Sequence, residues 1–227
     1  MTTSDVTDYC FVVEVATDDQ EWQSVELDIH EHDEAAKGQY LGVWQKLCQA
    51  LQKHHELGKR PPAPEWAAWK PGEWCDQKHG YESRLKFVAT CGANLVGFLN
   101  CWPNVPSVYD STKHVLYVEH LAAAPGNIDC ELWRKRFRFV GQALLAVAVL
   151  LSKQYGHEGR LGLHVADDRA FGFYRHISER HCGGNLFHPE QTGIPGPTPR
   201  REHERSKRYL ETVENAASEW LEGYRRD

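Results

Sequence analysis

The sequence lacks any hydrophobic run long enough to cross a membrane. None of the apolar stretches in its 227 residues reaches the ~18–20 residues that a membrane-spanning helix requires. Its first residues, Met-Thr-Thr-Ser-Asp-Val-Thr-Asp, also lack the basic and apolar pattern of a signal peptide. We therefore predict a cytoplasmic protein that has no membrane partner.

Recognisable cysteine, histidine and glycine patterns are missing as well. The seven cysteines are odd in number and contain no Cys-x-x-Cys pair, which favours reduced thiols over a disulfide framework. The thirteen histidines form no set with metal-ligand spacing, so we predict no metal site. Neither Gly-x-Gly-x-x-Gly nor Gly-Lys-Ser/Thr occurs at the entrance to the main predicted helix. This absence disfavours an unrelated nucleotide-binding α/β protein.

Basic residues are fewer than acidic residues. The chain has 26 Lys and Arg residues against 32 Asp and Glu residues, a formal net charge of −6. This balance argues against general nucleic-acid binding and favours, weakly, a cationic substrate. The hydrophobic content of 41%, with eight Trp, nine Tyr and eight Phe, supplies enough material for a core. We predict one globular domain over residues 1–227.

The chain is organised around a basic entrance to an apolar run. Four basic side chains crowd this entrance, at Arg134, Lys135, Arg136 and Arg138. Gly141 and Ala143 follow, and positions 144–151 are all apolar. The first N–H groups of a helix and its dipole attract anions, and small residues let a phosphate approach the backbone. The pattern fits a phosphate-binding loop and, equally, a buried helix with a charged entrance.

The segments on either side extend this pattern. A strand is predicted for residues 115–123 before the loop, and a strand and a helix for 161–165 and 168–177 after it. In this order the chain resembles the GNAT superfamily of acyl-CoA-dependent N-acetyltransferases. The resemblance covers about Arg84 to Tyr174. It rests on three motifs in order: Leu121-Ala122-Ala123, Arg138-x-x-Gly141-x-Ala143 and Ala170-x-x-Phe173-Tyr174.

The resemblance implies a fold and an activity. The fold is α/β, with a GNAT-like mixed, mostly antiparallel central sheet and helices on both faces. Its best-supported core is 84–177, completed by a C-terminal strand and helix within 205–227. The activity is transfer of an acetyl group from acetyl-CoA to an amine acceptor by direct attack in a ternary complex. The acceptor, a small molecule or a protein, is not indicated, and the resemblance is compatible with a homodimer.

The resemblance further implies where acetyl-CoA would bind. The strand end would offer backbone groups to the pantetheine arm, and the loop and helix start would hold the pyrophosphate. The candidate cofactor-binding residues are Leu121, Ala122, Ala123, Arg136, Arg138, Phe139, Val140, Gly141, Gln142, Ala143, Asp167 and Ala170. Asp167 stands where the family often has Asn, and a carboxylate cannot donate a hydrogen bond as an amide does.

Two candidate catalytic residues follow from position in the motifs. Glu119, two residues before Leu121, is either the base or water-orienting group, or an ion-paired strand residue. Tyr174 is either the acid that protonates the coenzyme thiolate, or a core tyrosine. Because alternate residues of a strand share a face, Glu119 should point the same way as Tyr117 and Leu121. His120 should point to the other face.

The rest of the chain is expected to complete the layers around this core. Apolar residues alternate over 25–29, which predicts one half-buried strand, and Asp33 can cap a helix over 34–53. A strand is predicted within 181–187, another at 208–212 and a helix over 214–226. Three tryptophans either line an acceptor pocket or cover the core: Trp66, Trp69 and Trp74.

The alternative function is a non-catalytic acyl-CoA-binding or sensor domain of the same fold. It stays open because the chain departs from the family pattern at two places. One is Asp167, and the other is Arg175-His176-Ile177, where the family continues with Gly-Phe.

Overall fold

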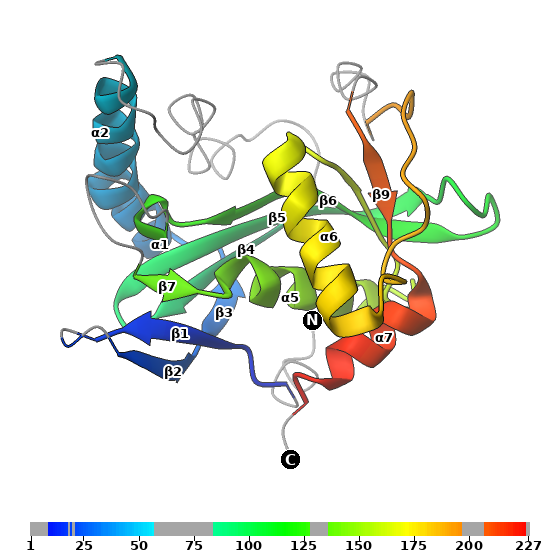
Figure 1. Cartoon of the computed structure of the whole chain (residues 1–227), viewed down its shortest axis with the longest axis horizontal. Helices are drawn as coiled ribbons and strands as arrows, with labels where there is room; N and C mark the ends of the chain where they lie inside the picture. Colours follow the sequence, from blue (N-terminus) through cyan, green and yellow to red (C-terminus); the bar gives the residue numbers. More distant parts are fainter. Residues whose placement is uncertain are drawn as a thin grey trace.

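Figure 1 shows a computed structural model of the chain, in which residues 9–17, 19, 21–56, 84–127, 136–196 and 207–225 are described. Its centre is a six-stranded sheet with the order β3-β4-β5-β6-β8-β9. The strands are β3 (Asp28–Glu31), β4 (Leu85–Cys91), β5 (Asn94–Pro106), β6 (His114–Ala123), β8 (Leu161–His164) and β9 (Tyr209–Glu211). Only β6 and β8 pair in parallel, and the other neighbours are antiparallel. The predicted mixed, mostly antiparallel sheet is confirmed.

Helices cover both faces of this sheet, as predicted (Figure 1). On β4, Phe87 and Ala89 belong to the main core beneath α5 (Val140–Gln154). Val88, between them, belongs to a second cluster on the opposite face. There Trp44, at the end of the π-helical turn η1 (Tyr40–Trp44), meets Phe98 edge to face with ring centroids 4.9 Å apart. The alternation of the strand side chains therefore feeds two separate apolar clusters.

Helix α5 is buried on almost every side because its sequence is apolar all round. All residues from Ala143 to Ser152 are buried. The close approach to the sheet depends on Gly97 of β5, where an added Cβ would lie 2.7 Å from Cδ1 of Leu144. The predicted buried helix after the basic entrance is confirmed.

The first strands form a second, three-stranded sheet with the order β2-β1-β7. Its members are β1 (Val12–Ala16), β2 (Trp22–Glu26) and β7 (Phe137–Arg138). The prediction of one strand over 25–29 is wrong, because β2 ends at Glu26 and β3 begins in the other sheet at Asp28. Leu27 lies between them, with its side chain buried and its N–H donating to the Phe11 carbonyl at 2.8 Å.

The remaining elements are α1 (Glu34–Gln39), α2 (Gln45–Glu56), the short η2 (Pro125–Asn127), α6 (Asp168–Cys182) and α7 (Glu214–Glu222). The predicted cap is confirmed, since the Ala36 N–H donates to the Asp33 carboxylate at 2.8 Å. The strand predicted within 181–187 is wrong. Helix α6 continues to Cys182, and Gly183 then ends it in the left-handed conformation that glycine favours.

Parts of the sequence-based predictions lie outside the described residues. These are the three tryptophans at positions 66, 69 and 74 and the basic residues at positions 134 and 135. Within the ranges given above, no helix is both long and apolar enough to cross a membrane.

Candidate functional site

The site is centred on the first turn of α5. Phe139 precedes the helix with φ of 67°, and no side chain caps its N–H groups. The Ala143 N–H donates to the Phe139 carbonyl at 2.9 Å. The N–H groups of Val140, Gly141 and Gln142 therefore come before the first bond inside the helix. Together with the dipole of a helix of 15 residues, they form a positive end that suits an anion.

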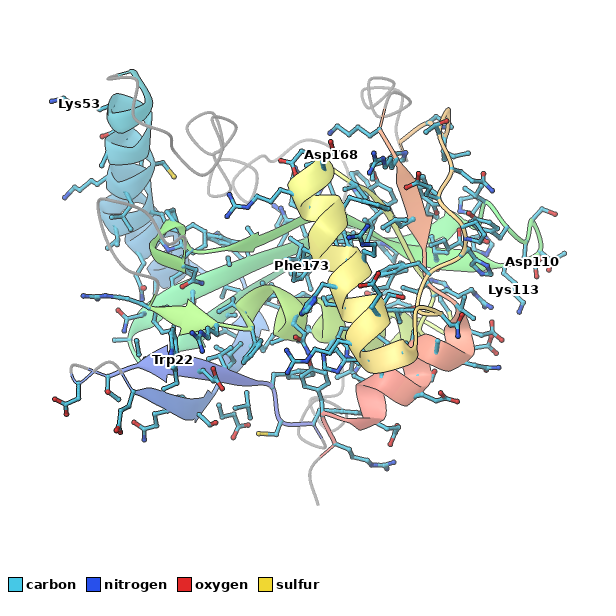
Figure 2. All side chains as sticks on the ribbon, viewed as in Figure 1. Trp22, Lys53, Asp110, Lys113, Asp168 and Phe173 are labelled. Atoms are coloured by element: carbon cyan, nitrogen blue, oxygen red, sulfur yellow. The ribbon has the colours of Figure 1, made fainter. Side chains whose placement is uncertain are left out.

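Strand β6 and helix α6 flank this first turn. A Cβ added to Gly141 would lie 3.1 Å from Cζ of Phe173 on α6 and 3.7 Å from Cδ2 of Leu121 on β6. Figure 2 shows Phe173 on α6, on the side turned toward α5. The glycine that the sequence suggested for ligand approach thus also makes room for an aromatic ring. Phe173 brings two of the predicted motifs into contact.

Strand β6 continues beyond its parallel partner at this place. The pairs between β6 and β8 run from Leu116 with Leu161 to Val118 with Leu163. Beyond them, residues 120–123 of β6 pair with β5 alone among the described strands. The predicted coenzyme residues Leu121, Ala122 and Ala123 lie in this stretch. Backbone N–H and C=O groups along such an edge can pair with an extended ligand that carries amides.

A β-bulge begins this stretch of β6. His120 pairs with Asn100 and Val118 pairs with Cys101, so Glu119 has no counterpart on β5. A bulge inserts one extra residue and changes which face the later side chains take. It puts a carboxylate and an imidazole next to each other, since His120 Nδ1 lies 3.8 Å from Glu119 Oε2.

The bulge overturns the predicted side-chain directions. Val118 and Leu121 both contribute to the core beneath α5, although they are three residues apart. Tyr117 belongs to a cluster with Trp102 outside that core. The prediction that Tyr117, Glu119 and Leu121 share a face is therefore wrong for Leu121. The prediction that His120 points away from Glu119 is wrong as well.

Glu119 is ion-paired in the structure. Its side chain is only 3% exposed, and Oε2 lies 3.2 Å from Nε of Arg84, whose side chain is 17% exposed. The Arg84 guanidinium also stacks on Trp102, 4.6 Å from the ring centroid. This arrangement explains how a carboxylate is retained in an otherwise apolar strand. Nothing in the local sequence marked Arg84 as its partner, because Arg84 lies just before β4, which is joined to β6 only through β5.

Tyr174 lies on α6 with its ring in the core. It contacts Phe173 and Phe187, with ring centroids 5.1 and 5.9 Å away. Burial raises the pKa of its hydroxyl, so the group stays neutral and keeps its proton. Within the described part of the chain, the hydroxyl has no hydrogen-bond acceptor. A neutral phenol in this state has a proton to donate.

The side chain of Arg138 is engaged by the three-stranded sheet. On β7 it forms an ion pair with Glu14 at 3.6 Å, and its guanidinium lies 3.7 Å from the centroid of the Trp22 ring. Trp22 is labelled in Figure 2 beside the three-stranded sheet. Arg138 therefore contributes positive charge near the helix start, while its donors are engaged on the neighbouring strands.

Two further predicted coenzyme residues also use their side chains within the protein. Gln142 Nε2 lies 3.0 Å from Nε2 of His181. The Asp167 carboxylate accepts the Ala170 N–H at 2.7 Å and so caps α6. What α5 offers an anion is therefore mainly its backbone. Among the described residues, no group of three or more His, Cys, Asp and Glu is placed to hold a metal ion.

Comparison with known proteins finds no matching family model and no matching curated protein. Solved structures do match. The PaiA N-acetyltransferase of Thermoplasma acidophilum, in complex with coenzyme A, is 15% identical, with 82% of this chain and 98% of that chain covered and a TM-score of 0.43. A putative GNAT-family acetyltransferase from Desulfovibrio desulfuricans is 16% identical, with 82% and 96% covered and a TM-score of 0.43.

A third match is a chimeric spermidine N-acetyltransferase from Vibrio cholerae and hSSAT. It is 13% identical, with 85% of this chain and 98% of that chain covered and a TM-score of 0.45.

Proposed function

We propose that this protein is an N-acetyltransferase that moves an acetyl group from acetyl-CoA to an amine. The observation that carries the proposal is the separation of β6 from β8 after Val118, next to the uncapped first turn of α5. An open strand edge and a positive helix end side by side suit a ligand with an amide-containing arm and a pyrophosphate. Acetyl-CoA has both parts.

The coenzyme would lie between β6 and the start of α5. Backbone groups of 121–123 would pair with the pantetheine arm, and the N–H groups of 140–142 would hold the pyrophosphate. Arg136 and Arg138 would add positive charge. The geometry supports no such role for the Asp167 side chain, which caps α6.

In the reaction, the amine nitrogen would attack the acetyl carbon of the thioester. The C–N bond forms, the C–S bond breaks, the nitrogen loses a proton and the thiolate gains one. Tyr174 is our candidate donor to the thiolate. Glu119, already held by Arg84, would accept a hydrogen bond from the amine or from a water and so orient it. Holding both substrates together can itself lower the barrier by ~7–11 kcal/mol.

Binding is tested by the melting temperature with and without acetyl-CoA, which must rise if the ligand favours the folded state. Two variants at one position isolate the backbone donor. Gln142→Pro removes the N–H in the first helical turn, where proline is tolerated, whereas Gln142→Ala removes only the side chain. We expect Gln142→Pro to lose most of the shift and Gln142→Ala to keep most of it. Equal shifts in the two variants would show that the helix start is not part of the binding site.

Turnover is tested by mass spectrometry on a panel of amines incubated with acetyl-CoA. Release of CoA is measured with and without each amine. We expect at least one amine to gain an acetyl group and to accelerate CoA release. A protein that binds acetyl-CoA but acetylates no amine would instead be a non-catalytic binding domain.

A further inference from the structure

A tyrosine and a histidine are hydrogen-bonded where β6 and β8 separate. The Tyr117 hydroxyl lies 2.8 Å from Nδ1 of His164, and His164 Nε2 lies 2.9 Å from the Ile194 carbonyl oxygen. A carbonyl oxygen only accepts hydrogen bonds, so Nε2 carries the ring proton. In the neutral ring, Nδ1 is then the acceptor, and the Tyr117 hydroxyl donates to it. The two groups form a directed chain from phenol to imidazole to backbone carbonyl.

The position of this pair relates it to the proposed site. Tyr117 is opposite Gly162, one step before the last pair between β6 and β8. Glu119 is the first β6 residue beyond that pair. Tyr117 clusters with Trp102, against which Arg84 stacks while it binds Glu119. The hydroxyl and the carboxylate are therefore on the same side of the sheet, at the place where an amine would meet the acetyl group.

We propose that Tyr117 and His164 accept the proton that the amine must lose; this inference rests on the proposed acetyltransferase function. The ammonium proton passes to the Tyr117 oxygen, directly or through one water, while the phenol proton passes to His164 Nδ1. The imidazolium keeps its Nε2–H bond to the Ile194 carbonyl. The freed lone pair of the nitrogen forms the C–N bond, and the C–S bonding pair leaves on sulfur. The new amide nitrogen then loses a second proton, which offsets the proton that the thiolate gains through Tyr174. The imidazolium returns its proton to solvent.

The division of labour between this pair and Glu119 follows from their partners. One Glu119 oxygen faces the Arg84 guanidinium and lies 3.8 Å from His120 Nδ1. That carboxylate is suited to holding a cation in place. The His164 ring instead lies in the middle of a hydrogen-bonded chain, with Nδ1 accepting the Tyr117 hydroxyl, and this arrangement is suited to passing on a proton.

The neighbouring groups on β9 are compatible with a proton-accepting role for His164. The Tyr209 ring centroid is 5.1 Å from that of His164, and the Tyr209 hydroxyl donates to Glu211 at 2.9 Å. Burial, and then the neighbouring Glu211, raises the pKa of Tyr209, so Tyr209 is neutral. Glu211 also accepts the Ser107 hydroxyl and the Val108 N–H. Its charge is thereby engaged away from the imidazole.

The experiment compares pH profiles of kcat/KM for Tyr117→Phe and His164→Gln. Phenylalanine keeps the ring, and glutamine keeps an N–H donor for the Ile194 carbonyl. We expect each variant to lose ~10²–10³ in kcat/KM near pH 7. The loss should shrink at high pH, where the amine deprotonates unaided. The double variant should be no worse than the single ones, because the two groups act as one unit.

Tyr209→Phe is the matched control. It removes a hydroxyl from a ring that lies beside His164 and is as buried as Tyr117. That hydroxyl donates its hydrogen bond to Glu211 and not to His164. We expect it to keep the wild-type profile, and we expect all three variants to keep the melting shift with acetyl-CoA. Wild-type profiles in Tyr117→Phe and His164→Gln overturn the proton-accepting role alone, as does a loss that is constant with pH. A wild-type protein that binds acetyl-CoA but acetylates no amine overturns this role together with the proposed function.

Discussion

The face of the six-stranded sheet beneath α5 is built from apolar side chains, whereas the opposite face also carries ion pairs and hydrogen-bonded rings. On the first face, Leu99, Leu116 and Val118 pack with α5 in one continuous core. On the other, which carries two smaller apolar clusters, Arg84 forms an ion pair with Glu119 and Tyr117 forms a hydrogen bond with His164. The same strands supply both faces, because their side chains alternate.

The difference between the two faces shows which residue types are explained by packing alone and which need specific partners. An aliphatic side chain gains free energy simply by leaving water. A buried polar group must find partners to avoid a cost of roughly 1–3 kcal/mol. On the second face, Glu119 meets this requirement through Arg84 and Tyr117 through His164, and Glu119 stands at the bulge of β6. We therefore expect mutations on the first face to affect stability and those on the second to affect activity.

Truncation beneath α5 should produce the largest effect on stability. Leu144 is fully buried against β5, so Leu144→Ala should lower the free energy of unfolding by ~2–5 kcal/mol. Activity per folded molecule should be retained. Urea unfolding and kinetics at a temperature where the variant is folded measure the two quantities. Tyr117→Phe, on the other face, should chiefly impair activity. It should lower the free energy of unfolding by ~1.5 kcal/mol at most. If Leu144→Ala chiefly impaired turnover, the distinction between the faces would fail.

Removing the charge of Glu119 should produce the next largest effect. Glu119→Gln keeps the shape and loses the ion pair with Arg84. We expect kcat/KM to fall ~10²-fold, as expected for a misplaced substrate, equivalent to ~2.7 kcal/mol of transition-state stabilisation. Because an orienting group takes no proton, the pH profile should keep its wild-type shape. A loss that disappears at high pH would make Glu119, rather than His164, the proton acceptor.

A side chain at position 141 tests whether the glycine serves packing, acetyl-CoA binding or both. Gly141→Val should cost ~1–3 kcal/mol, because its Cβ would lie 3.1 Å from Phe173. Shortening the neighbour in Gly141→Val with Phe173→Leu should recover part of that stability. The melting shift with acetyl-CoA should stay reduced in the double variant, since the branched side chain still crowds the first helical turn. Recovery of both properties together would mean that the glycine serves packing alone.

The smallest effect is expected from the Tyr174 hydroxyl. Burial raises its pKa above the ordinary value of 10.0, so the folded state keeps the proton after the unfolded state has released it. This contribution to stability is present below about pH 10 and is lost as the pH rises further. Tyr174→Phe should flatten the fall in unfolding free energy above that pH and cost less than ~1 kcal/mol near pH 7. Urea unfolding from pH 7 to 11 measures both.

The same variant tests the proposed acid. If Tyr174 protonates the thiolate, kcat should fall while the affinity for acetyl-CoA stays nearly constant, because only the transition state loses a donor. An unchanged kcat would leave Tyr174 as a core residue only.

Much of the layered fold could be predicted from local pattern. The apolar run over 144–151 indicated a helix buried on all sides, and α5 is such a helix. Residues 115–123 indicated a strand, and β6 spans His114–Ala123. Asp33 indicated a helix start through its own carboxylate. In each case the decisive interactions lie within a few residues or depend on a simple periodicity, so the sequence carries them directly.

The candidate site was predicted only in part. The motifs brought the first turn of α5, the end of β6 and the start of α6 together, as the contact of Gly141 with Phe173 and Leu121 requires. They did not indicate where the Arg138 and Gln142 side chains point, because Trp22 and His181 reach them from distant segments. The strand break at Leu27 was missed for a similar reason. Its apolar alternation is the same whether one sheet or two receive the strand.

What the sequence determined by itself was therefore the kind and order of elements, through helical and strand periodicity, caps and glycines. What only the tertiary structure decided was which distant groups meet. The bulge that turns Glu119 and Leu121 to different sides depends on how β6 pairs with β5. The bond between Tyr117 and His164 joins positions 47 residues apart through the pairing of β6 and β8. Strand register is a property of two segments at once, so no pattern within either segment specifies it alone.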